Sequence, residues 1–141
     1  MNYAGDVLAR DCWFDLETNQ MAQLVDVRTV PEWQFVGVPD LAGINKKVIS
    51  VEWQRYPDMQ VNADFIEDIS SRLEQLNCGK NDPVYMLCRS GVRSIAAADA
   101  MTSFGFTKVF NILHGFEGDK DQAGHRGKSA GWKFDELPWK Q

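Results

Sequence analysis

The sequence has few of the side chains that bind metal ions or form disulfide frameworks. Its 141 residues include only two histidines and three cysteines, which are Cys12, Cys78 and Cys88. No two of these cysteines form the C-x-x-C pair that is typical of zinc sites. An odd cysteine count in a chain of this length also argues against the disulfide framework of a small secreted domain. We therefore expect no metal site. We expect Cys12 and Cys78 to be buried, inert thiols, with a resolving role for Cys78 left open.

The chain also lacks an excess of positive charge and any long apolar run. Fifteen lysines and arginines stand against 20 aspartates and glutamates, which gives a net charge of −5 at pH 7. Nucleic acids and anionic membranes are bound by basic surfaces, so neither is an expected partner. No stretch approaches the ~20 apolar residues of a membrane span, and the N-terminus lacks a cationic start followed by an apolar core. The expected location is therefore the cytoplasm.

What the sequence does contain is sufficient for one α/β domain. Hydrophobic residues make up 44% of the chain and charged residues 25%, as in ordinary soluble proteins, and we treat 1–141 as a single domain. Apolar runs typical of strands alternate with segments at helical spacing, after an irregular start at 2–8. This alternation predicts a mainly parallel sheet of about five strands with helices on both faces. The predicted strands are 24–27, 47–51, 83–87 and 109–113, and the predicted helices are 9–17, 31–35, 62–77 and 94–105.

One cysteine lies where such a sheet binds ligands. Cys88 follows the predicted strand 83–87, and the alanine-rich segment 94–101 after it has high helix propensity. The loop 88–93, Cys-Arg-Ser-Gly-Val-Arg, therefore joins a strand end to a helix start, which is the ligand-binding edge of a parallel α/β sheet.

A cysteine in this position is suited to react as a thiolate. The first N–H groups of a helix have no intrahelical acceptor, and the helix macrodipole adds positive potential. A short loop that curls over Cys88 aims several amides at its sulfur and favours the thiolate. Gly91 permits a sharp turn, and Arg89 and Arg93 supply positive charge for an oxyanion. We expect a site with two arginines and no acid, which favours a small anionic substrate.

The loop 88–93 resembles the active-site loop of the rhodanese sulfurtransferases, which has the pattern Cys-x-x-Gly-x-Arg. Three other stretches are similar to rhodanese elements in the same order along the chain. They are Leu24-Val25-Asp26-Val27-Arg28 with Glu32, Phe104-Gly105-Phe106 with Val109-Phe110-Asn111-Ile112, and the ending Gly131-Trp132-Lys133 to Leu137-Pro138-Trp139. The resemblance covers most of the chain, and four ordered elements make it specific.

The resemblance implies a rhodanese-like three-layer α/β/α fold and a sulfurtransferase. In this reaction the Cys88 thiolate takes sulfane sulfur from an anionic donor such as thiosulfate and holds it as a persulfide. It then passes the sulfur to a thiophilic acceptor, which is cyanide, a thiol or a protein. No metal or organic cofactor is implied. The loop residues expected to bind the anion are Arg89, Ser90, Gly91, Val92 and Arg93.

Three residues outside this set are expected to support the site. Asp26 and Arg28 would form a structural hydrogen bond or ion pair that fixes the turn after the first predicted strand, and Ser94 directly follows the loop. Two regions depart from the rhodanese pattern. Residues 35–40 lack the histidine of the usual Gly-His-Ile-x-Gly-Ala, and 114–118, His-Gly-Phe-Glu-Gly, replace the usual Gly-Gly. Both are expected to line or support the pocket.

Two other functions remain open on the sequence. A small phosphatase or an arsenate reductase uses related cysteine chemistry, but phosphatases have Cys-x5-Arg, whereas four residues separate Cys88 from Arg93 here. Leu87 also stands where a histidine precedes the phosphatase cysteine. The second alternative is a catalytically idle rhodanese module that binds proteins, although such a module does not need Cys88 and both arginines.

The polar stretch at about 119–129 is predicted to be a surface loop, and it is long by usual loop lengths. We expect it to be simply exposed. The alternative is a lid whose His125 or Arg126 approaches the site or a partner. His114 is closer to the expected pocket rim, and we expect it to be a hydrogen-bonded structural residue.

Overall fold

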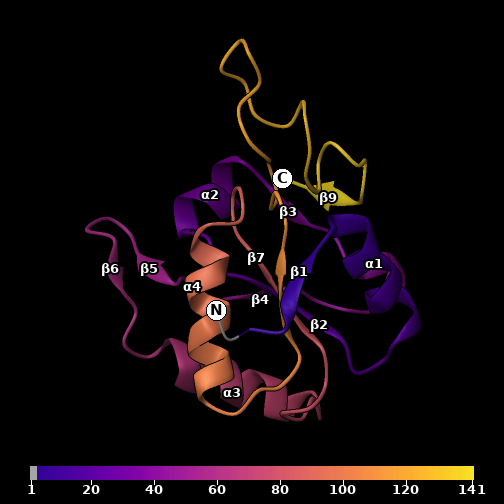
Figure 1. The fold of residues 1–141 in the computed structure, drawn as a ribbon, viewed down its shortest axis with the longest axis vertical. Helices are drawn as coiled ribbons and strands as arrows, with labels where there is room; N and C mark the ends of the chain where they lie inside the picture. The colour runs from indigo at the N-terminus through magenta and orange to yellow at the C-terminus, as the bar shows by residue number, and fades with distance from the viewer. Residues whose placement is uncertain (1–2) are drawn as a thin grey trace.

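The computed structural model describes residues 3–141 and is built around a five-stranded parallel sheet (Figure 1). The strand order is β1-β8-β7-β2-β4, and every neighbouring pair is parallel. All residues of β2 and β7 are buried, as expected for strands covered on both faces. The predicted α/β class and sheet are therefore confirmed. The strands are β1 (Gly5–Val7), β2 (Gln23–Asp26), β4 (Ile49–Ser50), β7 (Val84–Leu87) and β8 (Val109–Ile112).

Helices cover both faces of this sheet and complete the three-layer fold. They are α1 (Ala9–Thr18), α2 (Val30–Phe35), α3 (Phe65–Gln75) and α4 (Arg93–Ser103). One face packs against α3 and α4, and the other packs against α1 and the C-terminal segment around Trp132 (Figure 1). None of the helices in residues 3–141 has the length and apolar character needed to cross a bilayer.

The alternating direction of side chains along a strand divides the core into two apolar clusters. Val25 and Met86 belong to the cluster that contains the buried residues of α3 and α4. Leu24 and Leu87, their neighbours in sequence, belong to the cluster on the α1 side. Each central strand therefore anchors helices on both sides.

Two small antiparallel ribbons lie outside the main sheet. In one, β3 (Val38–Pro39) pairs with β9 (Trp139–Lys140), so the end of the described chain returns to the segment after α2. In the other, β5 (Gln54–Arg55) pairs with β6 (Gln60–Val61). A short 3₁₀ helix covers Ala42–Ile44.

Some predicted boundaries are wrong for identifiable reasons. The start of the chain, 2–8, was predicted to be irregular, but it contains the strand β1. Asn2 of this stretch lies outside the described residues. The short sequence of β1 is not apolar, and the strand forms through its pairing with β8. The third helix begins at Phe65 because the Asn62 side chain holds a turn, donating to the Glu52 carbonyl and accepting from the Asp64 amide.

Candidate active site

The loop that carries the predicted nucleophile lies at the carboxyl edge of the sheet. Cys88 directly follows β7, which lies between β8 and β2, and α4 begins at Arg93. The cysteine therefore lies at the carboxyl edge, as predicted, and the strand order places it at the middle of that edge. It is also only 1% exposed, so a reactant reaches its sulfur through the mouth of the loop. The structure thus differs from the usual partly exposed reactive cysteine.

Two hydrogen-bonding groups converge on the Cys88 sulfur. The Gly91 amide donates to Sγ at 3.1 Å, and the Ser94 hydroxyl lies 3.1 Å from the same atom. Gly91 has φ +105°, a conformation that favours glycine, so the predicted sharp turn is present. The amides of Ser90 and Val92 make no hydrogen bond to another described residue. The loop therefore keeps two backbone donors that no other described residue uses.

Ser94 connects the cysteine to a buried polar chain that the sequence did not reveal. Its hydroxyl donates to Asn111 Oδ1, and Asn111 Nδ2 donates to Asp6 Oδ1 at 2.9 Å. The Tyr3 hydroxyl donates to the same Asp6 oxygen at 2.9 Å. The only available signal was an asparagine within the apolar strand run 109–112.

The acceptor at the far end sets the direction of this chain. An ionised carboxylate only accepts hydrogen bonds, so Asn111 turns its NH₂ toward Asp6 and its oxygen toward Ser94. The single hydrogen of the Ser94 hydroxyl is then committed to Asn111, and its lone pairs face the Cys88 thiol. To stabilise a thiolate, the hydroxyl has to turn its hydrogen toward the sulfur. The Ser94 hydroxyl thus has two orientations, one in which it donates to Asn111 and one in which it donates to the Cys88 sulfur.

The expectation of a site without an acid is wrong. Arg93 pairs through two bonds with Glu32 of α2, with Nη1 to Oε1 at 2.7 Å and Nη2 to Oε2 at 2.9 Å. Glu32 also closes a capping box with Thr29 at the start of α2. A cation in the first turn of α4 is opposed by the helix macrodipole, and Glu32 offsets this unfavourable placement. Arg93 therefore fastens α2 to the active loop.

The ion pair also shifts the pKa of its members. Burial by itself raises the pKa of Glu32, but the hydrogen bonds and charge of Arg93 outweigh this and lower it from its ordinary value. Burial acts to lower the pKa of Arg93, whereas Glu32 raises it further. Both groups are therefore charged at neutral pH.

Asp26 and Arg28 form the expected structural pair at the end of β2. Both side chains are fully buried, and Arg28 Nη2 lies 2.7 Å from Asp26 Oδ2. The same nitrogen donates to the Gly37 carbonyl at 2.7 Å, and the guanidinium lies 4.3 Å from the centroid of the Phe116 ring. The pair joins the turn after β2 to the two regions that depart from the rhodanese pattern.

The segment after β8 supports the loop from behind. The Phe116 amide donates to the Cys88 carbonyl at 2.8 Å, and the Glu117 amide donates to the Arg89 carbonyl at 2.9 Å. These bonds fix the loop carbonyls on the side away from the sulfur. Gly115, at φ +61°, lies so close that an added Cβ would meet the Arg89 carbonyl oxygen at 2.7 Å. This support comes from backbone atoms, which explains why no side-chain pattern predicted it.

The remaining predicted residues lie at the mouth of the site or away from it. Val92 is 74% exposed, and the exposed Arg89 side chain forms no salt bridge within residues 3–141. The expected hydrogen bond of His114 is wrong, because its half-buried side chain bonds to no other described residue. Among the described residues, no three His, Cys, Asp or Glu side chains are grouped to hold a metal ion.

Cys12 and Cys78 are free, buried thiols. Burial raises the pKa of Cys12, and burial together with the Asp82 carboxylate raises the pKa of Cys78 to about 11. Because their pKa values are raised, the thiols of Cys12 and Cys78 are protonated at neutral pH. Cys78 precedes β7 in the chain, whereas Cys88 follows it.

A polar pocket of about 640 Å³ adjoins the loop. It is lined by Arg89, by Glu32, and by Lys120, His125 and Arg126 of the predicted surface loop. The surface loop 119–129 is exposed for most of its length, as expected. Some of its side chains also line the pocket that Arg89 lines. A larger groove of about 1340 Å³ is lined by the ends of α1 and α3 and by 38–50, and it contains no residue of the loop 88–93.

Comparison with protein-family models matches residues 4–141 to the STR4 middle domain. The chain belongs to this rhodanese-like family. The chain is 45% identical to the solved structure of Rv0390 from M. tuberculosis, with a TM-score of 0.88, covering 99% of this chain and 98% of that one. It is 39% identical over 124 residues to the uncharacterized protein RC0915 of Rickettsia conorii, covering 88% of this chain and 87% of that protein.

More distant matches extend the likeness of the chain to other rhodanese-like proteins. Rhodanese-like domain-containing protein 4 of Arabidopsis thaliana is 25% identical over 131 residues, which are 93% of this chain and 24% of that protein. Thiosulfate sulfurtransferase 16 of the same plant is 38% identical over 58 residues, 41% of this chain and 44% of that protein. The polysulfide-sulfur transferase of Wolinella succinogenes shares the fold, with a TM-score of 0.60 at 18% identity, covering 96% of this chain and 77% of that one.

Proposed function

We propose that this protein takes sulfane sulfur from an anionic donor such as thiosulfate onto Cys88 and passes it to a thiophilic acceptor. The observation that carries the proposal is that the loop closes on a single sulfur atom, with Gly91 N and Ser94 Oγ each 3.1 Å from Sγ. Free amides at Ser90 and Val92 remain for one further anionic atom. The name of the partial match, thiosulfate sulfurtransferase 16, is consistent with this chemistry.

The first half-reaction loads the cysteine. The Cys88 thiolate attacks the outer sulfur of thiosulfate, a new S–S bond forms, and sulfite leaves with the electron pair of the broken bond. Ser94 turns its hydroxyl hydrogen toward Sγ while the thiolate is present. Arg89, exposed and without a salt-bridge partner among residues 3–141, attracts the donor and steadies the leaving sulfite.

The second half-reaction returns the cysteine to its starting state. The outer sulfur of the persulfide rests among the loop amides, which stabilise its negative charge. An acceptor thiolate or cyanide attacks that sulfur, and the electron pair of the broken S–S bond returns to Cys88 Sγ. No metal or organic cofactor takes part in either proposed step.

The same geometry disfavours a phosphatase. A phosphoryl group on the sulfur carries three oxygens that each need a donor, and phosphatase loops have one more residue than this loop. Here Glu32 holds two edges of the Arg93 guanidinium, the group that a phosphatase uses to grip phosphate. Sulfur transfer therefore fits the loop better than phosphoryl transfer.

The decisive experiment follows the mass of the intact, reduced protein before and after thiosulfate. We expect a gain of one sulfur atom that cyanide removes and that is absent in Cys88→Ser. Cys78→Ser is the matched control, because it changes a buried thiol that lies outside the loop, and it should gain sulfur like the native protein. No gain with thiosulfate or with mercaptopyruvate would reject the proposal, and an aryl phosphate assay would then test the phosphatase alternative.

A further inference from the structure

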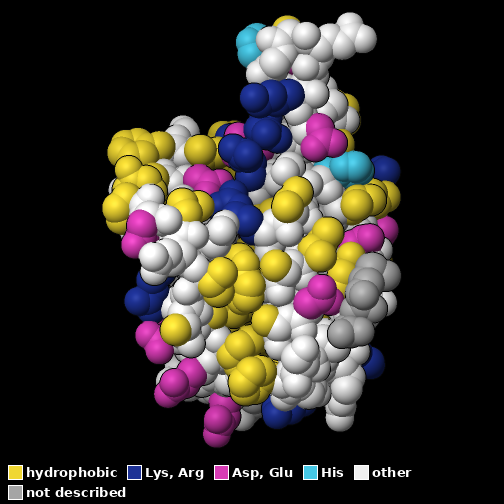
Figure 2. Space-filling view, turned by 60° about the vertical axis from the view of Figure 1, so that its left-hand side comes forward, with side chains coloured by type: hydrophobic (Ala, Val, Ile, Leu, Met, Phe, Trp, Pro, Cys, Tyr) yellow, Lys and Arg dark blue, Asp and Glu magenta, His cyan; other side chains and the backbone are white. Residues whose placement is uncertain are grey.

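A group of four basic residues stands beside the active loop. The surface loop 119–129 projects from the molecule (Figure 1), and we call it the projecting segment. One pocket is lined by Arg89 of the active loop and by Lys120, Arg126 and Lys128 of the projecting segment, and we call these four residues the basic wall. Figure 2 shows Lys and Arg side chains of this face as a column that leads down from the projecting segment. The whole chain has a net charge of −5, whereas the pocket lining has these four cations against the two acids Glu32 and Glu117 and so has the opposite sign.

The acids near the basic wall do not cancel its charge. Glu32 is neutralised by its two bonds to Arg93. The Asp121 carboxylate is turned into its own loop, where it accepts from the amides of Ala123 and His125 at 2.9 Å each. Glu117 is the other acid that lines the pocket. Among the residues that line the pocket, four cations therefore face Glu117 and the Glu32 carboxylate that is paired with Arg93.

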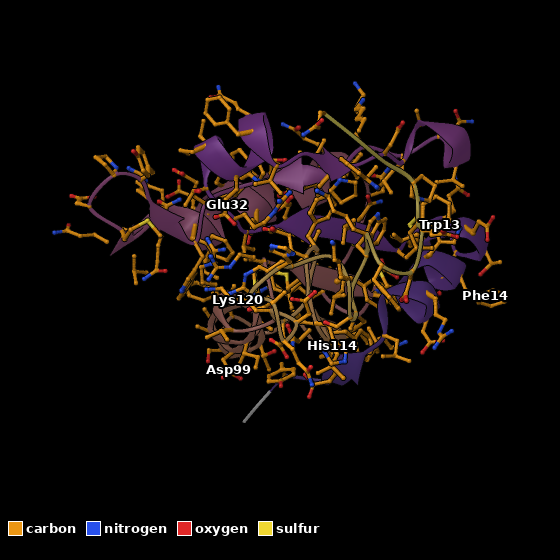
Figure 3. The ribbon with its side chains drawn as sticks, turned by 90° about the horizontal axis from the view of Figure 1, so that it is seen from above. Trp13, Phe14, Glu32, Asp99, His114 and Lys120 are labelled. Atoms are coloured by element: carbon orange, nitrogen blue, oxygen red, sulfur yellow. The ribbon has the colours of Figure 1, made fainter. Side chains whose placement is uncertain are left out.

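The basic wall is held in a defined position relative to Cys88. The amides of Glu117 and Gly118 donate to the Arg89 carbonyl at 2.9 and 3.2 Å. Arg126 Nη1 donates to the Gly118 carbonyl at 2.7 Å, and the Gly127 amide donates to the Glu117 carbonyl. Viewed from above, Lys120 and Glu32 lie on one side of the molecule, and Trp13 and Phe14 lie on the opposite side (Figure 3).

The basic wall is larger than a small donor needs, and apolar side chains flank it. Thiosulfate contacts only the few donors around Cys88, whereas the wall extends onto the projecting segment. Val92 at the loop and Phe35 at the end of α2 are 74% and 76% exposed. Exposed apolar residues beside a charged rim are typical of protein interfaces.

We propose that the basic wall docks an acidic segment of a thiol-bearing protein, which receives the sulfur from Cys88. This inference rests on the proposed function. The acceptor thiolate attacks the outer sulfur of the persulfide anion and forms a new S–S bond. The bond from Sγ to the outer sulfur breaks, its electron pair stays on Sγ, and no external oxidant or proton is required. Charge attraction raises the rate of encounter and aligns the thiol with the loop mouth.

The test uses the persulfide form of the full chain and two peptides of equal length, each with one cysteine. In one peptide the cysteine is flanked by glutamates, and in the other by serines. The measured quantity is the ratio of the two sulfur-transfer rate constants, acidic over uncharged, at low and high NaCl. For the K120E/K128E variant we expect this ratio to fall about tenfold at low salt and much less at high salt. Comparing ratios between proteins cancels the different thiol acidities of the two peptides.

The matched control is K47E/K108E, which makes the same change in net charge with two exposed lysines that do not line the pocket. It should keep the native ratio. If K120E/K128E also keeps the native ratio while both peptides accept sulfur, docking is overturned and sulfur transfer stands. If neither peptide nor cyanide accepts sulfur, the proposed function fails and docking fails with it. If oligouridylate inhibits transfer more than oligoglutamate of equal charge, the wall binds nucleic acid and the proposal is wrong.

Discussion

Cys88 combines almost complete burial with an unusual supply of hydrogen-bond donors. Burial alone favours the neutral thiol, as it does for Cys12 and Cys78, whose pKa values it raises. At Cys88, the Gly91 amide donates to the sulfur at 3.1 Å, and the Ser94 hydroxyl, 3.1 Å from it, becomes a second donor when it turns its hydrogen away from Asn111. All three thiols are buried, and among the described residues the Cys88 sulfur is the one that accepts a hydrogen bond from a backbone amide.

Ser94→Ala tests whether the Ser94 hydroxyl donates a hydrogen bond to the Cys88 thiolate. The variant removes a donor that the thiolate uses, and a hydrogen bond to a charged group is worth about 1.5–3 kcal/mol. We expect the rate of iodoacetamide modification of Cys88 at neutral pH to fall by roughly tenfold or more, and sulfur uptake to slow in parallel.

Thr102→Ala is the control for Ser94→Ala. It removes a hydroxyl from the same helix, where the Thr102 side chain donates to the Ala98 carbonyl, and it should leave both rates unchanged. Equal modification rates in native protein and Ser94→Ala would show that Ser94 serves Asn111 and not the sulfur.

Local pattern predicted the residues of the loop but not the polar chain behind it. Cys88 and Gly91 lie three residues apart in a strand–loop–helix unit, so the sequence shows their relation directly. Asp6 and Asn111 meet because they are register partners in the β1–β8 pair. No local pattern carries that information, and the weak strand propensity of β1 hid the pairing.

At the scale of elements, the loop is held by two neighbours. Glu32 of α2 binds Arg93 at the front, and the backbone of 115–118 binds the loop carbonyls at the back. The motif similarity pointed to Glu32 without its partner, because the pairing depends on the orientation of α2. Within the regions 35–40 and 114–118, Gly37 lies against β9 and Gly115 lies against the loop, and both are contacts that no local pattern shows.

Gly115→Ala tests the support from behind. Its φ of +61° disfavours a side chain, and the added Cβ would overlap the Cys88 and Arg89 carbonyls. We expect a loss of at least about 3 kcal/mol in the free energy of unfolding, from backbone strain and overpacking together. Urea denaturation measures this loss, and sulfur uptake by the folded fraction should fall as well.

Gly124→Ala separates the two contributions to the Gly115→Ala loss. Gly124 has φ +81° but nothing within 4 Å of an added Cβ, so only the backbone term applies, about 1 kcal/mol. Similar losses at the two positions would mean that the 115–118 segment moves aside and does not hold the loop.

At the scale of the whole molecule, several weakly acidic side chains, two thiols and one phenol, are buried in their neutral form. Burial is the largest cause of the raised pKa values of Cys12, Cys78 and Tyr85, and hydrogen bonding to Asp15 raises that of Tyr85 further. A group whose pKa is higher in the folded state ionises first in the unfolded state. Its contribution to stability is complete below the unfolded pKa and is lost as the pH rises toward the folded pKa. Lys46, whose pKa burial lowers, acts in the opposite direction, as does Lys133.

We therefore expect the protein to lose stability above about pH 9, the ordinary pKa of the two thiols. Each thiol that ionises only in the unfolded state lowers the free energy of unfolding by about 1.4 kcal/mol per pH unit. For Cys78 the window runs from pH 9.0 to about 11, so Cys78→Ala removes roughly 2 kcal/mol of the loss by pH 10.5. Urea unfolding in reducing buffer at pH 8 and pH 10.5 measures the difference.

Cys78→Ala starts from a lower stability at pH 8 because it leaves a small cavity, yet its decline with pH should be shallower than that of the native chain. Parallel declines would mean that Cys78 ionises as easily in the folded protein as in the unfolded chain, and that the buried environment around it is open to water.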